Sequence, residues 1–337
     1  MRALRRLAYS TLGLAYALIV FGAIVRISGS GMGCGDHWPR CYGSWFPPLD
    51  QPTLVIEWTH RLLAAITVAM VAALVLLALR RRSEAGVGGR GGVLRAASLA
   101  GLLIIVQAML GMITVRMGNS AGATVAHLLN GALLLAALAA TVLRAGGLGS
   151  RLMDRATPVM RRAARGSAAG AAIALIVVLF GGLTAKIPGA NSACTGFPLC
   201  SGSWLPSIPA QYVQFTHRLI AFLLFFHVLG LLIGFTRRRE APAVIRTVRV
   251  AFALICLQLV IAAAMVELQL PPALRSLHEA DGIAIWLSLF TLAWLARFTP
   301  VHTELEPAKQ ASDPSSLPRT ASPAHSMAVI VARGALS

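Results

Sequence analysis

The sequence predicts an all-α integral membrane protein with eight transmembrane helices, arranged as two tandem four-helix bundles. The first observation is composition: 57% of the 337 residues are hydrophobic and only 12% are charged, which is too apolar for an ordinary soluble domain. The second is that eight stretches supply the roughly 20 mostly apolar residues that a helix needs to cross a bilayer. The third is an internal repeat that divides these stretches into two sets of four.

The first predicted span looks like a signal peptide, because three arginines precede an apolar run. It is long enough to cross, however, and it has a counterpart in the second half of the chain, so it counts as a span. The eight predicted spans are residues 7–25, 62–79, 96–115, 121–143, 166–185, 219–235, 250–266 and 277–296.

The basic residues behind the net charge of +18 are distributed unevenly among the loops between these spans. If the amino terminus is cytoplasmic, 23 of the 30 lysines and arginines fall on the inner side, including six arginines between residues 144 and 165. This is the asymmetry of the positive-inside rule, and it predicts a multi-pass protein with both termini in the cytoplasm. No aromatic residues interleave with the arginines, so nucleic acid is not an expected partner.

Two long blocks carry the repeat. FGAIVRISGSGMGCGDHWPRCYGSWFPP begins at Phe21, and FGGLTAKIPGANSACTGFPLCSGSWLPS begins at Phe180. Four spans are an even number, so both units enter the membrane in the same orientation, which predicts a parallel repeat with a pseudo-two-fold axis along the membrane normal. Further matches are Thr59-His60-Arg61 with Thr216-His217-Arg218 at an offset of 157, and Gln107, His127 and Gly131 with Gln258, His278 and Gly282 at an offset of 151.

The repeat also divides the chain into segments. The N-terminal four-helix unit covers residues 1–145 and the C-terminal unit covers residues 166–298, with a cytoplasmic linker at 146–165. Residues 299–337 turn polar and rich in Pro and Ser, which predicts a disordered cytoplasmic tail.

Four histidines occupy matching places, each near the outer start of an even-numbered span: His60, His127, His217 and His278. Equal depth allows His60 to face His127 and His217 to face His278. Two imidazoles on facing helices can hold heme iron axially in a bundle core. A single interfacial histidine is more simply a hydrogen-bonding residue, but four at repeated positions favour heme. His227 lies mid-span without a counterpart and is interpreted as structural.

Four of the five cysteines fall in the two long outer loops. On an oxidising face, close pairs favour the disulfides Cys34–Cys41 and Cys194–Cys200. Zinc is the alternative, with His37 as a third ligand, although structural zinc usually takes four.

The residues around the histidines suggest roles for three further side chains. Arg61 and Arg218 each follow a histidine at the level where heme propionates would emerge, so they are candidate propionate contacts; snorkelling to lipid phosphate is the alternative. Glu57 lies three residues before His60, on the same helical face, whereas its counterpart is Gln214. This break in the repeat suggests that chemistry occurs in the first unit and that the second holds a cofactor; an ordinary interfacial glutamate is the alternative.

Together these residues resemble the heme A synthases of bacteria, which are related to the mitochondrial enzyme. The resemblance covers nearly the whole chain before the tail. It rests on Glu57-x-x-His60-Arg61, Cys34 and Cys41, His127, Cys194 and Cys200, Thr216-His217-Arg218, and His278.

The resemblance implies an enzyme of the bacterial plasma membrane that oxidises the methyl group of heme O to the formyl group of heme A for terminal oxidases. It implies that His217 and His278 bind the iron of a resident heme b, that His60 and His127 bind the substrate heme, and that Glu57 is the catalytic carboxylate. Heme O synthase and cytochrome oxidase assembly are the implied partners, besides lipid; a homo-oligomer is an open possibility.

Two other classes share some of these features. A bis-histidine b-type cytochrome that exchanges electrons with quinone would have the four histidines, but it gives no reason for the Glu57–Gln214 difference. A heme or metal transporter predicts polar or Gly/Pro-broken positions at mid-membrane depth, where these spans are smooth apart from His227. The electron acceptor or donor, the oxygen source and the redox role of the cysteines stay open at this point.

Overall fold

The computed structural model describes residues 1–149, 158–203 and 205–298. Within these ranges the chain is helical, and eight helices are long and apolar enough to cross a membrane, as predicted. The predicted tail at 299–337 and the middle of the predicted linker lie outside the described residues. The helices are α1 (Arg2–Ile27), α2 (Pro52–Arg80), α3 (Val93–Arg116), α4 (Ala121–Arg144), α5 (Pro158–Lys186), α6 (Pro209–Arg237), α7 (Pro242–Glu267) and α8 (Pro272–Phe298).

Seven of the eight helices extend beyond the predicted apolar spans at both ends, whereas α4 begins at the predicted residue. Five of them begin at a proline, which is suited to the first helical position because its missing N–H has no partner there in any case. The largest differences are at α2 and α6, which begin about ten residues before the predicted spans; α5 begins at Pro158, inside the segment predicted as linker. An apolar-run criterion detects only the part of a helix in hydrocarbon, so polar terminal turns that continue the same helix escape it.

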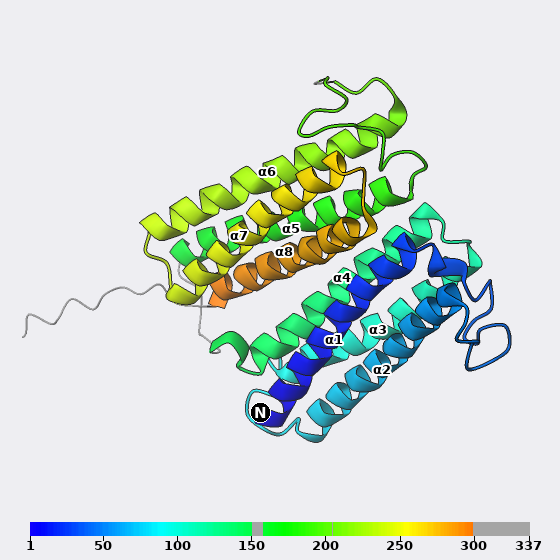
Figure 1. Cartoon of the computed structure of the whole chain (residues 1–337). Helices are drawn as coiled ribbons and strands as arrows, with labels where there is room; N and C mark the ends of the chain where they lie inside the picture. The colour runs from blue at the N-terminus through cyan, green and yellow to red at the C-terminus, as the bar shows by residue number, and fades with distance from the viewer. Residues whose placement is uncertain (150–157, 204, 299–337) are drawn as a thin grey trace, which may run out of the picture. The chain divides into compact units, whose positions relative to one another are not determined.

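Each half of the chain forms its own four-helix bundle (Figure 1). In the first, α1 packs on α2 and α4, and α3 packs on α2 and α4; in the second, α5 packs on α6 and α8, and α7 packs on α6 and α8. The bundles meet through α1 against α8, α4 against α5, and α4 against α8. The parallel relation of the two halves stays a prediction.

Helices α4 and α8 form the centre of this arrangement because each contacts two helices of the other bundle, whereas α1 and α5 each contact one. In the most apolar stretch of each helix, 61% of the residues of α4 and 44% of those of α8 are buried, against 17–28% for the other six. Tyr16 of α1 donates to the carbonyl of Ala280 on α8 at 2.9 Å, and Arg26 of α1 pairs with Glu279 of α8. The histidine-bearing helices α4 and α8 are therefore also the ones that join the halves.

Candidate functional site

A single cavity of about 1060 Å³ connects the two bundles and is lined by residues from all eight helices. It lies toward the end of the helices at which residues 28–51 and 187–203 form the cysteine loops; we call this the loop end. His60, His127, His217 and His278 all line this cavity, and so does Glu57. Its volume is at the upper limit of typical small-molecule sites. The structure thus brings together the residues that the sequence singled out.

The second histidine pair has the spacing of two ligands on one metal ion. The ring centroids of His217 and His278 lie 6.3 Å apart. With a metal–imidazole bond of about 2 Å, two rings on opposite sides of one ion have centroids roughly 6 to 6.5 Å apart. His217 Nδ1 lies 3.1 Å from the carbonyl oxygen of Val177 and donates to it, which leaves Nε2 with a free lone pair. These residues therefore fit a heme held by two axial imidazoles.

The first pair is held differently. His60 stacks on Phe21, with ring centroids 6.3 Å apart and planes 11° apart. His127 Nε2 lies 3.2 Å from Nε2 of Gln107, and the Gln107 amide is fixed in turn by Asn130, whose Nδ2 donates to Gln107 Oε1 at 2.7 Å. Because an amide nitrogen can only donate, the Nε2 lone pair of His127 is occupied. In the second half, Gln258 instead donates to the backbone carbonyl of His278 at 2.8 Å.

Glycines on neighbouring helices make room for three of the imidazoles. A Cβ atom on Gly22, Gly111 or Gly181 would lie 3.2–3.3 Å from Cε1 of His60, His127 or His217, respectively. Such small residues let a ring pack directly on a helix backbone. Sequence reasoning missed these positions, although Gly22 and Gly181 stand in the repeated FG pair that opens each block.

Glu57 is buried, with 3% of its surface exposed, and it ties the first cysteine loop to α2. One carboxylate oxygen accepts the backbone N–H of Cys34 at 2.8 Å, and the other is bonded by Arg61. Gln214 accepts the backbone N–H of Cys194 at 2.7 Å, so a neutral amide is sufficient for this anchoring contact. The negative charge of Glu57 is therefore not needed to hold the loop.

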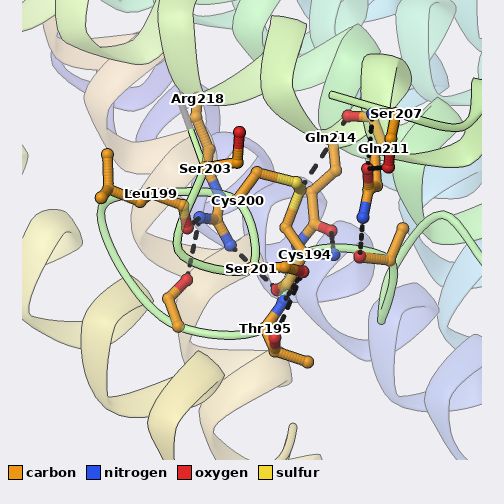
Figure 2. Close-up of a disulfide and its surroundings, with 12 residues drawn as sticks. Cys194, Thr195, Leu199, Cys200, Ser201, Ser203, Ser207, Gln211, Gln214 and Arg218 are labelled. Atoms are coloured by element: carbon orange, nitrogen blue, oxygen red, sulfur yellow. Dashed lines mark hydrogen bonds between the residues drawn. A yellow bond between two sulfur atoms is a disulfide. The ribbon is translucent and has the colours of Figure 1, made fainter. Parts of the chain in front are cut away.

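Arg61 and Arg218 hold the loops by their guanidinium groups. Figure 2 shows Arg218 and Gln214 reaching from α6 toward the loop that contains Cys194 and Cys200. Contact of Arg61 and Arg218 with heme propionates stays a prediction: both residues line the cavity, but both also donate to loop carbonyls. Arg218 donates to the carbonyls of Cys194, Gly196, Pro198 and Leu199 at 2.7–3.3 Å, and Arg61 donates to those of His37, Pro39 and Arg40 at 2.7–3.3 Å.

Both predicted cysteine pairs are disulfides in the structure, Cys34–Cys41 and Cys194–Cys200. The alternative zinc site is not formed: His37 packs against Tyr42 with ring centroids 5.0 Å apart, and no group of three His, Cys, Asp or Glu side chains within the described ranges is placed to hold a metal ion. The structural interpretation of His227 agrees with its contact to the carbonyl oxygen of Gly166, at 2.9 Å.

A smaller cavity of about 340 Å³ adjoins the first half of the large one. It is lined by apolar residues of α2 and α3 and by Trp38. Four of its lining residues also line the large cavity: Trp38, Val68, Ile104 and Ala108. Ile105 and Met109, on its other side, are more than half exposed, so the small cavity lies between the main cavity and the lipid-facing surface of the bundle.

The fold and the site define a class: a multi-pass membrane protein whose helices enclose a cavity lined by paired imidazoles. The chain matches the family described as cytochrome oxidase assembly protein over residues 5–290, and it belongs to that family.

Curated relatives agree with this family. The chain is 33% identical to the heme A synthase of Shouchella clausii over 247 residues, 72% of this chain and 80% of that protein. It is 28% identical to the heme A synthase of Geobacillus kaustophilus over 307 residues, 90% of this chain and 92% of that protein. It is also 29% identical to the protoheme IX farnesyltransferase of Thermus thermophilus over 291 residues, 81% of this chain but 45% of that protein.

Proposed function

We propose that this chain is a heme A synthase, which oxidises the methyl group of heme O to the formyl group of heme A by successive hydroxylation. The observation that carries the proposal is the single cavity that brings Glu57 and two unlike histidine pairs together. The family and its relatives named heme A synthase support it. A cytochrome that only transfers electrons would not need the buried charge of Glu57, since Gln214 makes the same loop contact.

The second half holds the resident cofactor in this proposal. His217 and His278 bind the iron of heme b, because their spacing suits one ion and Nε2 of His217 is free to ligate. When bound, this heme supplies one-electron redox chemistry. The protein contributes orientation: the Val177 carbonyl fixes the His217 tautomer, and Gly181 leaves space for its ring.

The first half binds heme O as substrate between His60 and His127. His60, which stacks on Phe21, is the ligand of the substrate iron. The Nε2 lone pair of His127 instead accepts a hydrogen bond from Gln107. This contact leaves one side of the substrate iron without a protein ligand until Gln107 moves. An open side is needed if an oxidant is to approach the iron, which two histidine ligands would prevent.

Glu57 serves as the catalytic carboxylate. It lines the cavity three residues before His60, where it can accept a proton from the substrate or stabilise positive charge that develops near the methyl group. Two hydroxylations of one methyl carbon give a gem-diol, which loses water to form the aldehyde. Arg61 and the N–H of Cys34 hold the carboxylate in place.

The farnesyl chain of heme O has a suitable place in the small apolar cavity between α2 and α3. This cavity adjoins the first half of the main one and shares part of its lining: Trp38, Val68, Ile104 and Ala108. A hydrocarbon chain there would avoid water and could extend toward lipid. A heme farnesyltransferase, such as the Thermus relative's name describes, is the class of enzyme that would supply this substrate.

In this proposal the protein lies in a bacterial plasma membrane, with the loop end outside and both termini in the cytoplasm. Most arginines would then lie inside, and the two disulfides would lie on the oxidising face.

The deciding experiment is co-expression with a heme O synthase in a bacterial host that makes no heme A, followed by chromatography of the extracted hemes. We expect heme A and its hydroxylated intermediate in cells that contain the protein and neither in cells with an empty vector. Protein that inserts and carries heme but produces neither compound would favour the quinone-linked cytochrome instead.

A further inference from the structure

A cluster of charged side chains lines the cavity at the loop end, where the two bundles meet. Its members are Arg26 on α1, Lys186 on α5, and Arg275 and Glu279 on α8. Arg26 and Glu279 form an ion pair in which each side chain is 22% exposed, and Lys186 and Arg275 both lie within electrostatic range of Arg26. Three positive charges and one negative charge leave the cluster with a net charge of +2.

The cluster stands just beyond the histidines, on the side of the loop end. Arg275 precedes His278 by three residues, which is one helical turn on the same face. Lys186 follows Gly181, the glycine beneath His217, by five residues, a rise of about 7.5 Å. Arg26 likewise follows Gly22, beneath His60, by four residues. The positive charges therefore lie one to one and a half turns from the imidazoles in the same cavity.

A net charge of +2 in a partly buried, mostly apolar cavity is unfavourable unless anions compensate it. Glu279 compensates one of the three cations. A heme brings two carboxylates on one edge of a flat apolar ring. If that edge faces the loop end, its carboxylates meet the cluster. The sequence predicted Arg61 and Arg218 as the propionate contacts, but both donate hydrogen bonds to carbonyls of the cysteine loops.

We propose that Arg26, Lys186 and Arg275 form the binding site for the two propionates of the heme held by His217 and His278, with Glu279 orienting Arg26. Lys186 lies on α5, which packs against this histidine pair, and Arg275 lies on α8, which contains His278. Arg26 belongs to the other bundle and reaches the site through its ion pair with Glu279. The bound heme thereby links α1 to α5 and α8. This assignment rests on the proposed function, since it takes a heme in the second half as given.

The test compares two ligands that differ only in the carboxylates. Full-length protein is made in a heme-depleted host, purified in detergent, and titrated with hemin and with hemin dimethyl ester, following the low-spin absorbance of the bis-histidine complex. We expect the wild type to bind hemin about tenfold or more tightly than the ester, because hydrogen bonds to charged groups are stronger than neutral ones. In the double variant Lys186→Gln/Arg275→Gln, hemin affinity should fall to that of the ester.

The ester serves as the internal control for folding, since an intact variant must bind it as the wild type does. Arg116→Gln, at the loop end of α3 but outside the cavity lining, should keep the preference for hemin. If the double variant keeps that preference, or loses a co-purified anionic phospholipid instead, the propionate assignment is wrong. If the wild type binds neither ligand, or His278→Ala leaves the low-spin spectrum unchanged, the heme site of the proposed function fails as well.

Discussion

The two histidine pairs share one cavity but are held in opposite ways. His217 and His278 face each other at a distance that suits one ion, and Gln258 contacts only the backbone of His278. In the first half, Gln107 contacts the ring nitrogen of His127 itself. The spacing of the second pair therefore suits two ligands on one ion, whereas one imidazole of the first pair is restrained by Gln107.

The difference between the two glutamines has a physical origin one turn further along α4 and α8. Asn130 donates to Gln107 Oε1 and so directs the Gln107 amide nitrogen at His127. At the corresponding position, 151 residues later, stands Asp281. A carboxyl group has no N–H to offer, and both Asp281 Oδ2 and Gln258 Oε1 lack a hydrogen-bond partner in the described part of the chain. Without that donor, Gln258 turns to the carbonyl of His278.

The largest expected effect tests the Glu57–Gln214 difference. Glu57→Gln should lower heme A formation by about 100-fold or more, because general acid–base catalysis contributes roughly 10²–10⁴, while resident heme b and expression stay unchanged. Heme chromatography and the absorbance spectrum of purified protein measure both. Gln214→Glu is the matched control and should retain activity; equal activity of Glu57→Gln and the wild type would remove Glu57 from the reaction.

The next prediction separates cofactor from substrate ligands. His278→Ala should remove most of the heme b that co-purifies with the protein, because one of two axial ligands is lost. His127→Ala should leave that heme in place and stop turnover. A pyridine hemochrome assay measures the amount of heme b per mole of protein. The reverse pattern would exchange the roles of the two halves.

Replacing Gln107 should change how the iron of heme O is coordinated, not how much heme O the first half binds. In Gln107→Leu, His127 Nε2 is free, so heme O bound in the first half should convert to a low-spin, bis-histidine form that resists oxidation. Electron paramagnetic resonance of the oxidised protein, loaded by co-expression with a heme O synthase, would show the low-spin signal increase. Gln258→Leu is the comparison and should leave the spectrum of the second half nearly unchanged; the restraint on His127 is refuted if the two variants behave alike.

The smallest effect concerns the glycine beneath His217. Gly181→Ala places a methyl group 3.2 Å from the imidazole, so the ring must shift by a few tenths of an ångström, and heme b affinity should fall by about threefold to tenfold, since overpacking costs on the order of 1 kcal/mol. Hemin titration of apoprotein measures it. Gly13→Ala, where nothing lies within 4 Å, should have no effect, and a comparable loss there would indicate a general helix effect.

Much of the site could be predicted because its signals are local or repeated. Apolar runs of membrane length gave the eight helices, and the matching positions of His60, His127, His217 and His278 singled out the residues that line one cavity. The cysteine pairs were predictable because their partners are close in sequence.

The tertiary structure decided what each residue contacts. Arg61 and Arg218 lie next to histidines in sequence but donate to loop carbonyls, because a long side chain at a helix start can turn toward the backbone that folds over it. Lys186 and Arg275, 89 positions apart in sequence, line one cavity only because α5 packs on α8. Sequence alone determined the class of membrane protein and the chemical groups present. The packing between distant helices decided which imidazole lone pairs are free and which cationic side chains can bind an anion. No local sequence pattern encodes these contacts.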